Sequence, residues 1–137
     1  MRLLLDTDVI VDYLLVRQPF FANARAILQA ADPGVFDLFI SAITPVNVFY
    51  LARKAAGIAV ARQLIADLLD AVSVCVVDAA VLRAALSSPM TDFEDAVPHE
   101  SAAAAGIDII VTRNVRDYRL ATLPVVTPAE FVVQQLQ

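Results

Sequence analysis

The sequence has one cysteine, one histidine, one lysine and no tryptophan in 137 residues. Because Cys75 stands alone, no intrachain disulfide can form, and a zinc site built on cysteines is excluded. A lone histidine such as His99 is more often a partly buried polar side chain than a catalytic base, and the sequence offers it no evident partner. The chemistry of the chain is therefore expected from other residue types.

Long hydrophobic runs are also missing, although 59% of the residues are apolar. A transmembrane helix needs about 20 unbroken apolar residues, and the apolar stretches here have the length of strands. Asp6 and Asp8 interrupt the first apolar run where the hydrophobic part of a secretory signal would continue. The composition is too apolar for a disordered chain. We therefore expect one domain over residues 1–137, located in the cytoplasm and not in a membrane.

Basic residues are few, with 10 Lys and Arg against 15 Asp and Glu, which gives a formal net charge of −5. On net charge alone, this balance disfavours a nucleic-acid partner. The positions of the acids are therefore the feature that needs an explanation.

Apolar runs of strand length alternate with helical patterns along the chain. This alternation predicts an α/β fold, a three-layer α/β/α sandwich around a mainly parallel sheet of four to five strands. The expected strands are residues 2–5, 36–41, 72–77, 107–111 and 123–126, the third of them buried. The expected helices are residues 9–14, 19–28, 44–54, 58–69, 79–86, 95–106 and a terminal helix that begins at residues 127–128.

Several acids lie where the functional edge of such a sheet is expected, because ligands bind beyond the carboxyl ends of parallel strands. Asp6 directly follows the first strand, and Asp117 follows the fourth by a few residues. Asp92, Glu94 and Asp95 open one helix. Clustered carboxylates without His or Cys suit Mg²⁺ or Mn²⁺, and such a cation supports in-line displacement at phosphorus.

Each acid also has a plain structural interpretation. Asp is a good N-cap, and acids in a first helical turn complement the helix dipole. Capping is sufficient for Asp78 and serves equally well for Asp92. A solvated helix face is the better interpretation of Asp12, Asp67 and Asp70.

Four segments resemble, in their order and spacing, the motifs of the PIN domain family, and together they span nearly the whole chain. A fifth, TPAEF at residues 127–131, resembles the family's terminal helix. The four segments are LLLDTDVIVDY at residues 3–13, ISAITPVNVFY at 40–50, DFEDA at 92–96 and IIVTRNVRDY at 109–118.

The resemblance implies a PIN-like fold and a Mg²⁺- or Mn²⁺-dependent ribonuclease of the kind that is the toxin in bacterial toxin–antitoxin pairs. The expected products of hydrolysis carry a 5′-phosphate and a 3′-hydroxyl. It also implies an RNA substrate, a small antitoxin protein as partner and a homodimer. The candidate contact surfaces are the helices that carry Phe20, Phe21, Phe49 and Tyr50.

Carried over residue by residue, the resemblance implies that Asp6, Asp95 and Asp117 are the catalytic, metal-binding acids. Asn114 and Asp92 would complete or orient the shell of the cation. These five side chains come from three separate segments of the sequence.

The supporting residues implied by the family pattern are Thr112, Glu94 and Asn47. Many members have a glutamate where this chain has Asn47. An asparagine can hold water or a phosphate oxygen, but it has no charge and cannot act as a base. Catalysis would then be slower or would rely on Asp92 and Glu94.

Arg113, Arg116 and Arg119 follow the fourth strand, close to the expected site. They form either a solvated helical turn or a basic rim that binds RNA phosphates, for which the planar guanidinium is well shaped. We expect Arg113 and Arg116 to bind phosphate.

Two other functions are compatible with parts of the sequence. Asn47 would also suit a degenerate PIN fold that binds RNA or protein without catalysis. The motif at residues 6–9 also resembles the nucleophile motif of haloacid-dehalogenase phosphohydrolases, which form an aspartyl-phosphate. That chemistry needs a lysine, and Lys54 has no strand before it to aim it at Asp6.

Overall fold

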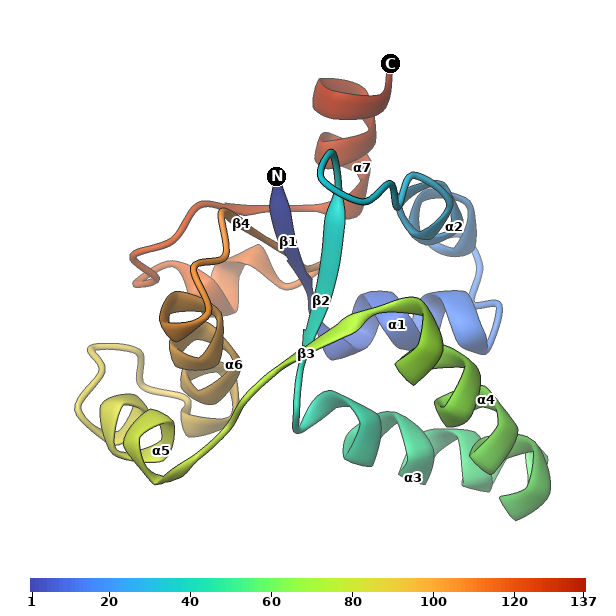
Figure 1. Cartoon of the computed structure of the whole chain (residues 1–137), viewed down its shortest axis with the longest axis horizontal. Helices are drawn as coiled ribbons and strands as arrows, with labels where there is room; N and C mark the ends of the chain where they lie inside the picture. The colour runs from blue at the N-terminus through green and yellow to red at the C-terminus, as the bar shows by residue number, and fades with distance from the viewer.

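A computed structural model describes residues 1–137, and a five-stranded sheet forms its centre (Figure 1). All four strand pairs are parallel, in the order β3-β2-β1-β4-β5. This confirms the predicted α/β architecture. The strands are β1 (Arg2–Leu5), β2 (Asp37–Ser41), β3 (Ser73–Cys75), β4 (Ile109–Val111) and β5 (Val125–Val126).

Helices cover both faces of the sheet. The layer on one face contains α1 (Thr7–Leu14), α2 (Phe21–Gln29), α3 (Thr44–Ala56), α4 (Ile58–Ala71) and α7 (Pro128–Phe131), which continues as a π-helical segment (Val132–Leu136). The other face is covered by α5 (Ala79–Leu86), α6 (Phe93–Ala104) and the 3-10 helix Val115–Tyr118. Figure 1 shows these two layers on opposite sides of the strands.

The first strand shows why a parallel sheet forms here. Side chains alternate between the faces of a strand, so Leu3 and Leu5 enter one hydrophobic cluster and Leu4 enters the other. All three side chains are fully buried. A strand buried on both faces needs a continuous apolar run rather than an alternating one.

The third strand differs from the expectation. Residues 72–77 were predicted to form a buried strand, but only Ser73–Cys75 is a strand, and β3 lies at an edge of the sheet. Val74 and Val76 are exposed by 40% and 67%. An apolar run alone does not distinguish a central strand from an edge strand, which was the cause of the error.

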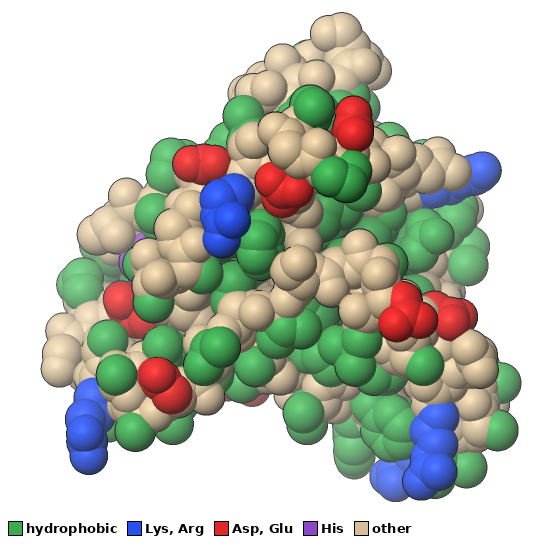
Figure 2. All heavy atoms as spheres, in the orientation of Figure 1, with side chains coloured by type: hydrophobic (Ala, Val, Ile, Leu, Met, Phe, Trp, Pro, Cys, Tyr) green, Lys and Arg blue, Asp and Glu red, His purple; other side chains and the backbone are tan.

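Charged side chains are spread over the surface. On the face drawn in Figure 2, the Lys and Arg side chains lie apart from one another and form no continuous basic stripe. Such a stripe is the usual electrostatic footprint of a nucleic-acid-binding surface. No helix of the chain is both long enough and apolar enough to span a membrane.

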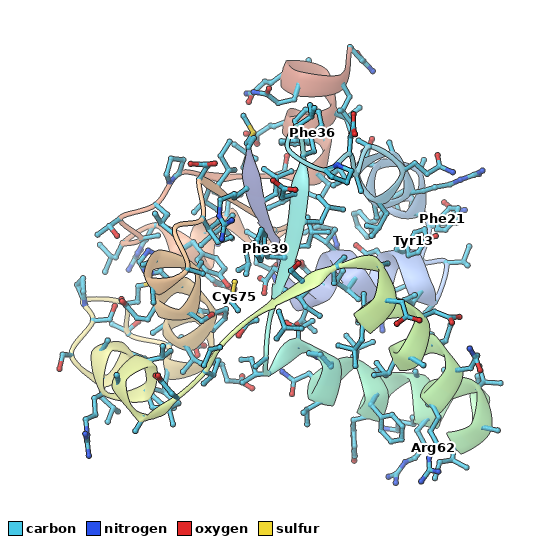
Figure 3. All side chains as sticks on the ribbon, viewed as in Figure 1. Tyr13, Phe21, Phe36, Phe39, Arg62 and Cys75 are labelled. Atoms are coloured by element: carbon cyan, nitrogen blue, oxygen red, sulfur yellow. The ribbon has the colours of Figure 1, made fainter.

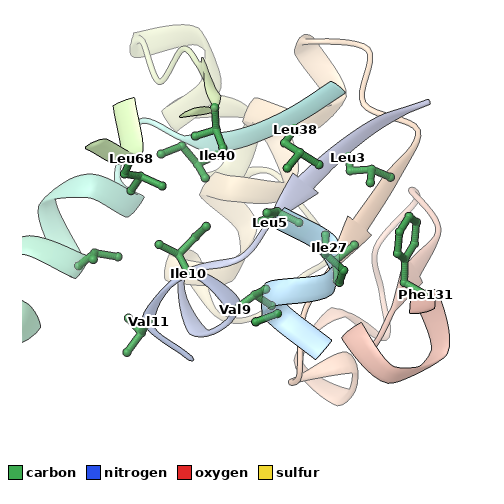
Figure 4. Close-up of a cluster of buried hydrophobic side chains, with 14 residues drawn as sticks. Leu3, Leu5, Val9, Ile10, Val11, Ile27, Leu38, Ile40, Leu68 and Phe131 are labelled. Atoms are coloured by element: carbon green, nitrogen blue, oxygen red, sulfur yellow. The ribbon is translucent and has the colours of Figure 1, made fainter. Parts of the chain in front are cut away.

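Aromatic side chains help to join the helical layers to the sheet (Figure 3). Tyr13 of α1 and Phe21 of α2 stack with their ring centroids 6.0 Å apart. Phe36 meets Phe131 edge to face at 5.9 Å, which fixes α7 beside the start of β2. Figure 4 shows the core cluster to which Phe131 belongs, between the sheet and α1, α2 and α4.

Candidate metal and phosphate site

Asp6 lies at the carboxyl end of β1, the central strand. Its backbone N–H donates to the carbonyl of Val111 at 3.0 Å. Its Oδ1 accepts the N–H of Thr7 at 2.9 Å, as the N-cap of α1, and its Oδ2 accepts the hydroxyl of Thr112 at 2.9 Å. These donors fix the orientation of the carboxylate at the point where ligands bind in open α/β sheets.

The acids predicted from separate segments meet beside Asp6. Burial raises the pKa of Asp95, in the first turn of α6, to about 7, and the surrounding carboxylates raise it further. Like charges have such an effect only when they are close together. The carboxylates that act on Asp95 are, in order of effect, those of Asp92, Asp6, Asp117 and Glu94.

Asp92 has two roles in the local structure. It is the N-cap of α6, and its Oδ1 accepts the N–H of Glu94 at 2.8 Å. The capping interpretation therefore holds, yet the same side chain also faces the acid group around Asp95. Asp78 is the cap of α5, where it accepts the N–H of Val81 at 2.9 Å, and it lines neither hollow of the site described below.

Two hollows meet at Asp95. The first, the arginine hollow, has a volume of about 310 Å³ and is lined by Asp92, Asp95, Arg116, Asp117, Arg119 and their neighbours. The second, the asparagine hollow, has a volume of about 290 Å³ and is lined by Asp6, Asp8, Arg17, Asn47, Glu94, Asp95, Asn114 and their neighbours. Most of the predicted site residues thus line one continuous surface on either side of Asp95.

The donor set fits a hard divalent cation. The side chains that face the hollows are carboxylates and the amides of Asn47 and Asn114, and oxygen donors are what Mg²⁺ and Mn²⁺ prefer. No three acidic or histidine side chains are close enough together to hold a metal by themselves. Mg²⁺ commonly takes only one or two protein carboxylates and completes its shell with water and phosphate.

Asp8 is a site residue that the sequence analysis treated only as a possible helix cap. Burial first, and then the charge of Asp6, raise its pKa to about 6. Its Oδ1 is buried without a hydrogen-bond partner, an unsatisfied acceptor of the kind that a bound ligand satisfies. Its position two residues after the strand-ending Asp6 was the available signal, since both then lie at the sheet edge.

Tyr118 is a second residue that the sequence did not single out. Its side chain is 2% exposed, and its hydroxyl is buried without a hydrogen-bond partner. Burial raises its pKa, and the negative charges of Asp6 and Asp95 raise it further. The phenol therefore keeps its proton and presents a neutral O–H to the acids.

Two expectations for charged side chains differ from the structure. Asp12, expected on a solvated helix face, is 1% exposed. Arg113, expected to bind RNA phosphate, donates from Nε and Nη2 to the two carboxylate oxygens of Asp12 at 2.6 and 3.2 Å. Its guanidinium also lies 3.9 Å from the ring centroid of Phe20. Arg113 lines neither hollow, so Arg116 and Arg119 are the arginines that face the acids.

Asn47 and the single lysine occupy different positions relative to the site. Asn47, on α3, is exposed and lines the asparagine hollow. Lys54 is near the end of the same helix and lines neither hollow. An aspartyl-phosphate mechanism would need that lysine beside Asp6, so this geometry does not support the phosphohydrolase alternative.

His99 serves the fold, as the sequence suggested for a lone histidine. It is 3% exposed, and its Nε2 accepts the N–H of Thr122 at 3.1 Å. A ring nitrogen that accepts a hydrogen bond carries no proton, so the imidazole is neutral. His99 joins α6 to the segment before β5 and lines neither hollow.

Solved structures with the same fold come from several bacteria. A chain of a toxin–antitoxin complex from Klebsiella pneumoniae is 24% identical, with a TM-score of 0.69 over 91% of this chain and 96% of that chain. A chain of VapBC2 from Rickettsia felis, bound to a DNA fragment from its promoter, is 14% identical with a TM-score of 0.69 over 93% and 98%. VapC20 from Mycobacterium tuberculosis, described as a sarcin–ricin loop cleaving toxin, is 17% identical with a TM-score of 0.65 over 79% and 86%.

Sequence comparison gives a family for most of the chain. No curated protein sequence matches it. Residues 2–116 match the family model described as PIN domain, a span that includes β1 to β4 and the acids that meet at Asp95. On this match and on the shared fold, the chain belongs to the PIN domain family.

Proposed function

We propose that residues 1–137 form one PIN-like domain that acts as a Mg²⁺- or Mn²⁺-dependent endoribonuclease, the toxin of a toxin–antitoxin pair. The observation that carries the proposal is the meeting of Asp6, Asp95 and Asp117 at the carboxyl edge of the sheet, next to Arg116 and Arg119. Acids that bind a cation and arginines that bind phosphate are the two parts that phosphodiester hydrolysis needs.

Asp6 and Asp95 would hold the principal cation, with Asp117, Asn114 and Asp92 completing or orienting its shell. When bound, the cation supplies activation of water and stabilisation of charge at phosphorus. The hydroxyl of Thr112 and the N–H of Thr7 keep the Asp6 carboxylate in a fixed orientation. Such preorganisation means that the carboxylate does not have to reorient during the reaction.

The substrate would be an RNA strand laid across the two hollows. Arg116 and Arg119 would bind its phosphates, because an arginine fork matches phosphate oxygens in a way that a lysine does not. In the reaction, the oxygen of a water molecule bonds to phosphorus and the bond to the 3′ oxygen breaks. The products carry a 5′-phosphate and a 3′-hydroxyl.

The proposed partner is a small antitoxin protein, and the proposed assembly is a homodimer acting in the cytoplasm. Support comes from the similar chains of known structure, which include members of toxin–antitoxin complexes. Of the four candidate aromatic contacts, Tyr50 on α3 is the most exposed, at 60%. Phe21 stacks on Tyr13, and Phe20 lies against Arg113, so these two rings already have partners within the chain.

Cleavage of a quenched single-stranded RNA, with Mn²⁺ or Mg²⁺ present, tests the proposal. We expect cleavage by the wild type, and loss of at least about a hundredfold in rate in Asp6→Asn or in EDTA, because either change removes the central ligand or the cation. Asp70→Asn, an exposed acid on α4 away from both hollows, should leave the rate unchanged.

Two results would overturn the proposal. Equal activity of wild type, Asp6→Asn and the EDTA sample would exclude a metal-dependent mechanism centred on Asp6. RNA binding without cleavage by the wild type, measured by fluorescence anisotropy, would favour the degenerate binding module instead, in agreement with a neutral Asn47 at this position.

A further inference from the structure

The side chain of Arg113 is bound within the protein rather than presented to solvent. Its Nε and Nη2 meet both oxygens of the buried Asp12 carboxylate, at 2.6 and 3.2 Å. The ring of Phe20 covers the guanidinium at 3.9 Å. Three contacts from α1 and from the start of α2 therefore fix one side chain on the turn after β4.

The backbone of the same residue reaches the acid group. The N–H of Arg113 donates to Oδ2 of Asp8 at 3.0 Å. The preceding hydroxyl, Thr112 Oγ1, donates to Oδ2 of Asp6 at 2.9 Å and accepts the N–H of Asn114 at 3.1 Å. Residues 112–114 thus hold two carboxylates of the site through hydrogen bonds that depend on the position of this turn.

We propose that Arg113 is a positioning residue: by binding Asp12, it holds the turn 112–114 so that Thr112 and the Arg113 N–H orient the carboxylates of Asp6 and Asp8 toward a cation. The inference rests on the proposed function for the identity of the ligand. It replaces the role expected from sequence, in which Arg113 would bind RNA phosphate.

Arginine is needed here for its shape as well as its charge. A planar guanidinium binds both oxygens of one carboxylate and stacks on an aromatic face at the same time. Lysine keeps the positive charge opposite Asp12 but cannot make two parallel hydrogen bonds. Methionine keeps the aliphatic contact with Phe20 and leaves the buried Asp12 carboxylate without its partner.

Groups that orient metal ligands affect metal affinity by about 10- to 100-fold when they are removed. We therefore expect Mn²⁺ affinity, measured by titration calorimetry, to fall by about tenfold or more in Arg113→Met and by a smaller factor in Arg113→Lys. The matched control is Leu68→Ala, a buried residue of α4 that lowers stability without contacting the site. Its Mn²⁺ affinity should equal that of the wild type.

Amide hydrogen exchange in EDTA provides a measurement that needs neither metal nor RNA. In Arg113→Lys and Arg113→Met, the amides of residues 113 and 114 should exchange faster relative to the core amides of β1. In Leu68→Ala, these amides and the core should change together. If cleavage is measurable, kcat should fall with KM nearly constant, whereas a phosphate-binding residue would raise KM and alter the salt dependence.

The outcomes separate this inference from the proposed function. A wild type that neither binds Mn²⁺ nor cleaves RNA would overturn the proposed function, while the exchange data would still report on the turn. Unchanged exchange at residues 113 and 114 in Arg113→Lys, or a wild-type Mn²⁺ affinity in either Arg113 variant, would overturn the positioning role. If Arg113→Met does not fold, Arg113→Lys decides the question.

Discussion

The crowding of carboxylates around Asp95 predicts that the metal-free protein is destabilised by its own site. The pKa of Asp95 is raised from its ordinary value of 3.8 to about 7 by burial first and then by neighbouring negative charges. A raised pKa means that the folded state binds more protons than the unfolded state between these two values. Stability contributed by this group is therefore fully present below about pH 4 and is lost as pH rises to about 7.

The substitution Asp95→Asn removes this cost while keeping the shape of the side chain. A shift of about three pKa units corresponds to about 4 kcal/mol for a fully shielded group. Asp95 is only partly buried, so solvent screening reduces this figure by at least about half. A negative charge in the first turn of α6 also interacts favourably with the helix dipole, by about 0.5 kcal/mol. The net gain expected for Asp95→Asn at pH 8 is about 1 kcal/mol, or about 3–5 °C in Tm for a domain of this size.

Thermal and urea unfolding of the two proteins in EDTA, from pH 4 to pH 8, measures the difference directly. The variant should match the wild type near pH 4 and exceed it at pH 8. Added Mn²⁺ should raise the Tm of the wild type more than that of Asp95→Asn, because the cation binds the folded state through this carboxylate. Asp70→Asn, the exposed control on the opposite edge of the sheet, should show no such pH dependence. An Asp95→Asn protein less stable than the wild type at pH 8 in EDTA would refute the reasoning.

Three further predictions concern other residues. Arg116→Ala combined with Arg119→Ala should weaken RNA binding by about tenfold and reduce the salt dependence of affinity by about two contacts, whereas Arg83→Ala on α5 should change neither in an anisotropy titration. Asn47→Glu should tighten Mn²⁺ binding by about three- to tenfold, since it adds a carboxylate to the asparagine hollow, and calorimetry that shows equal or weaker binding would contradict this. Asp78→Ala should lower the free energy of unfolding in urea by about 1 kcal/mol through loss of the α5 cap, with no effect on RNA cleavage.

The sequence was sufficient for the features that depend on local patterns. The apolar run before Asp6 predicted β1, and its abrupt end placed this acid at the carboxyl edge. The alternation of strands and helices predicted the three layers. The caps at Asp78 and Asp92 followed from the preference of aspartate for the N-cap position.

Features that depend on contacts between distant residues could not be predicted in this way. Asp12 was expected in solvent because its own segment is a helix with a polar position, and its partner, Arg113, is 101 residues away in the sequence. Asp8 and Asp12 lie four residues apart and therefore on the same face of α1, which was a signal for a shared partner but did not identify it. The edge position of β3 likewise depends on the order of strands, which an apolar run does not encode.

The acidic composition and the proposed substrate are compatible once the positions of the charges are considered. The excess of acids over bases is five in the whole chain, and Asp6, Asp95 and Asp117 lie in one small region. Without a cation, that region repels phosphate; a divalent cation offsets two of its negative charges, and Arg116 and Arg119 lie on the same side. The sign of the potential that an RNA phosphate meets is therefore set by metal occupancy at the sheet edge rather than by the net charge of the chain. For this reason a net charge of −5, which argues against a polyanionic partner when it is taken alone, is what a metal-dependent nuclease site of this kind produces when its acids outnumber the arginines around them.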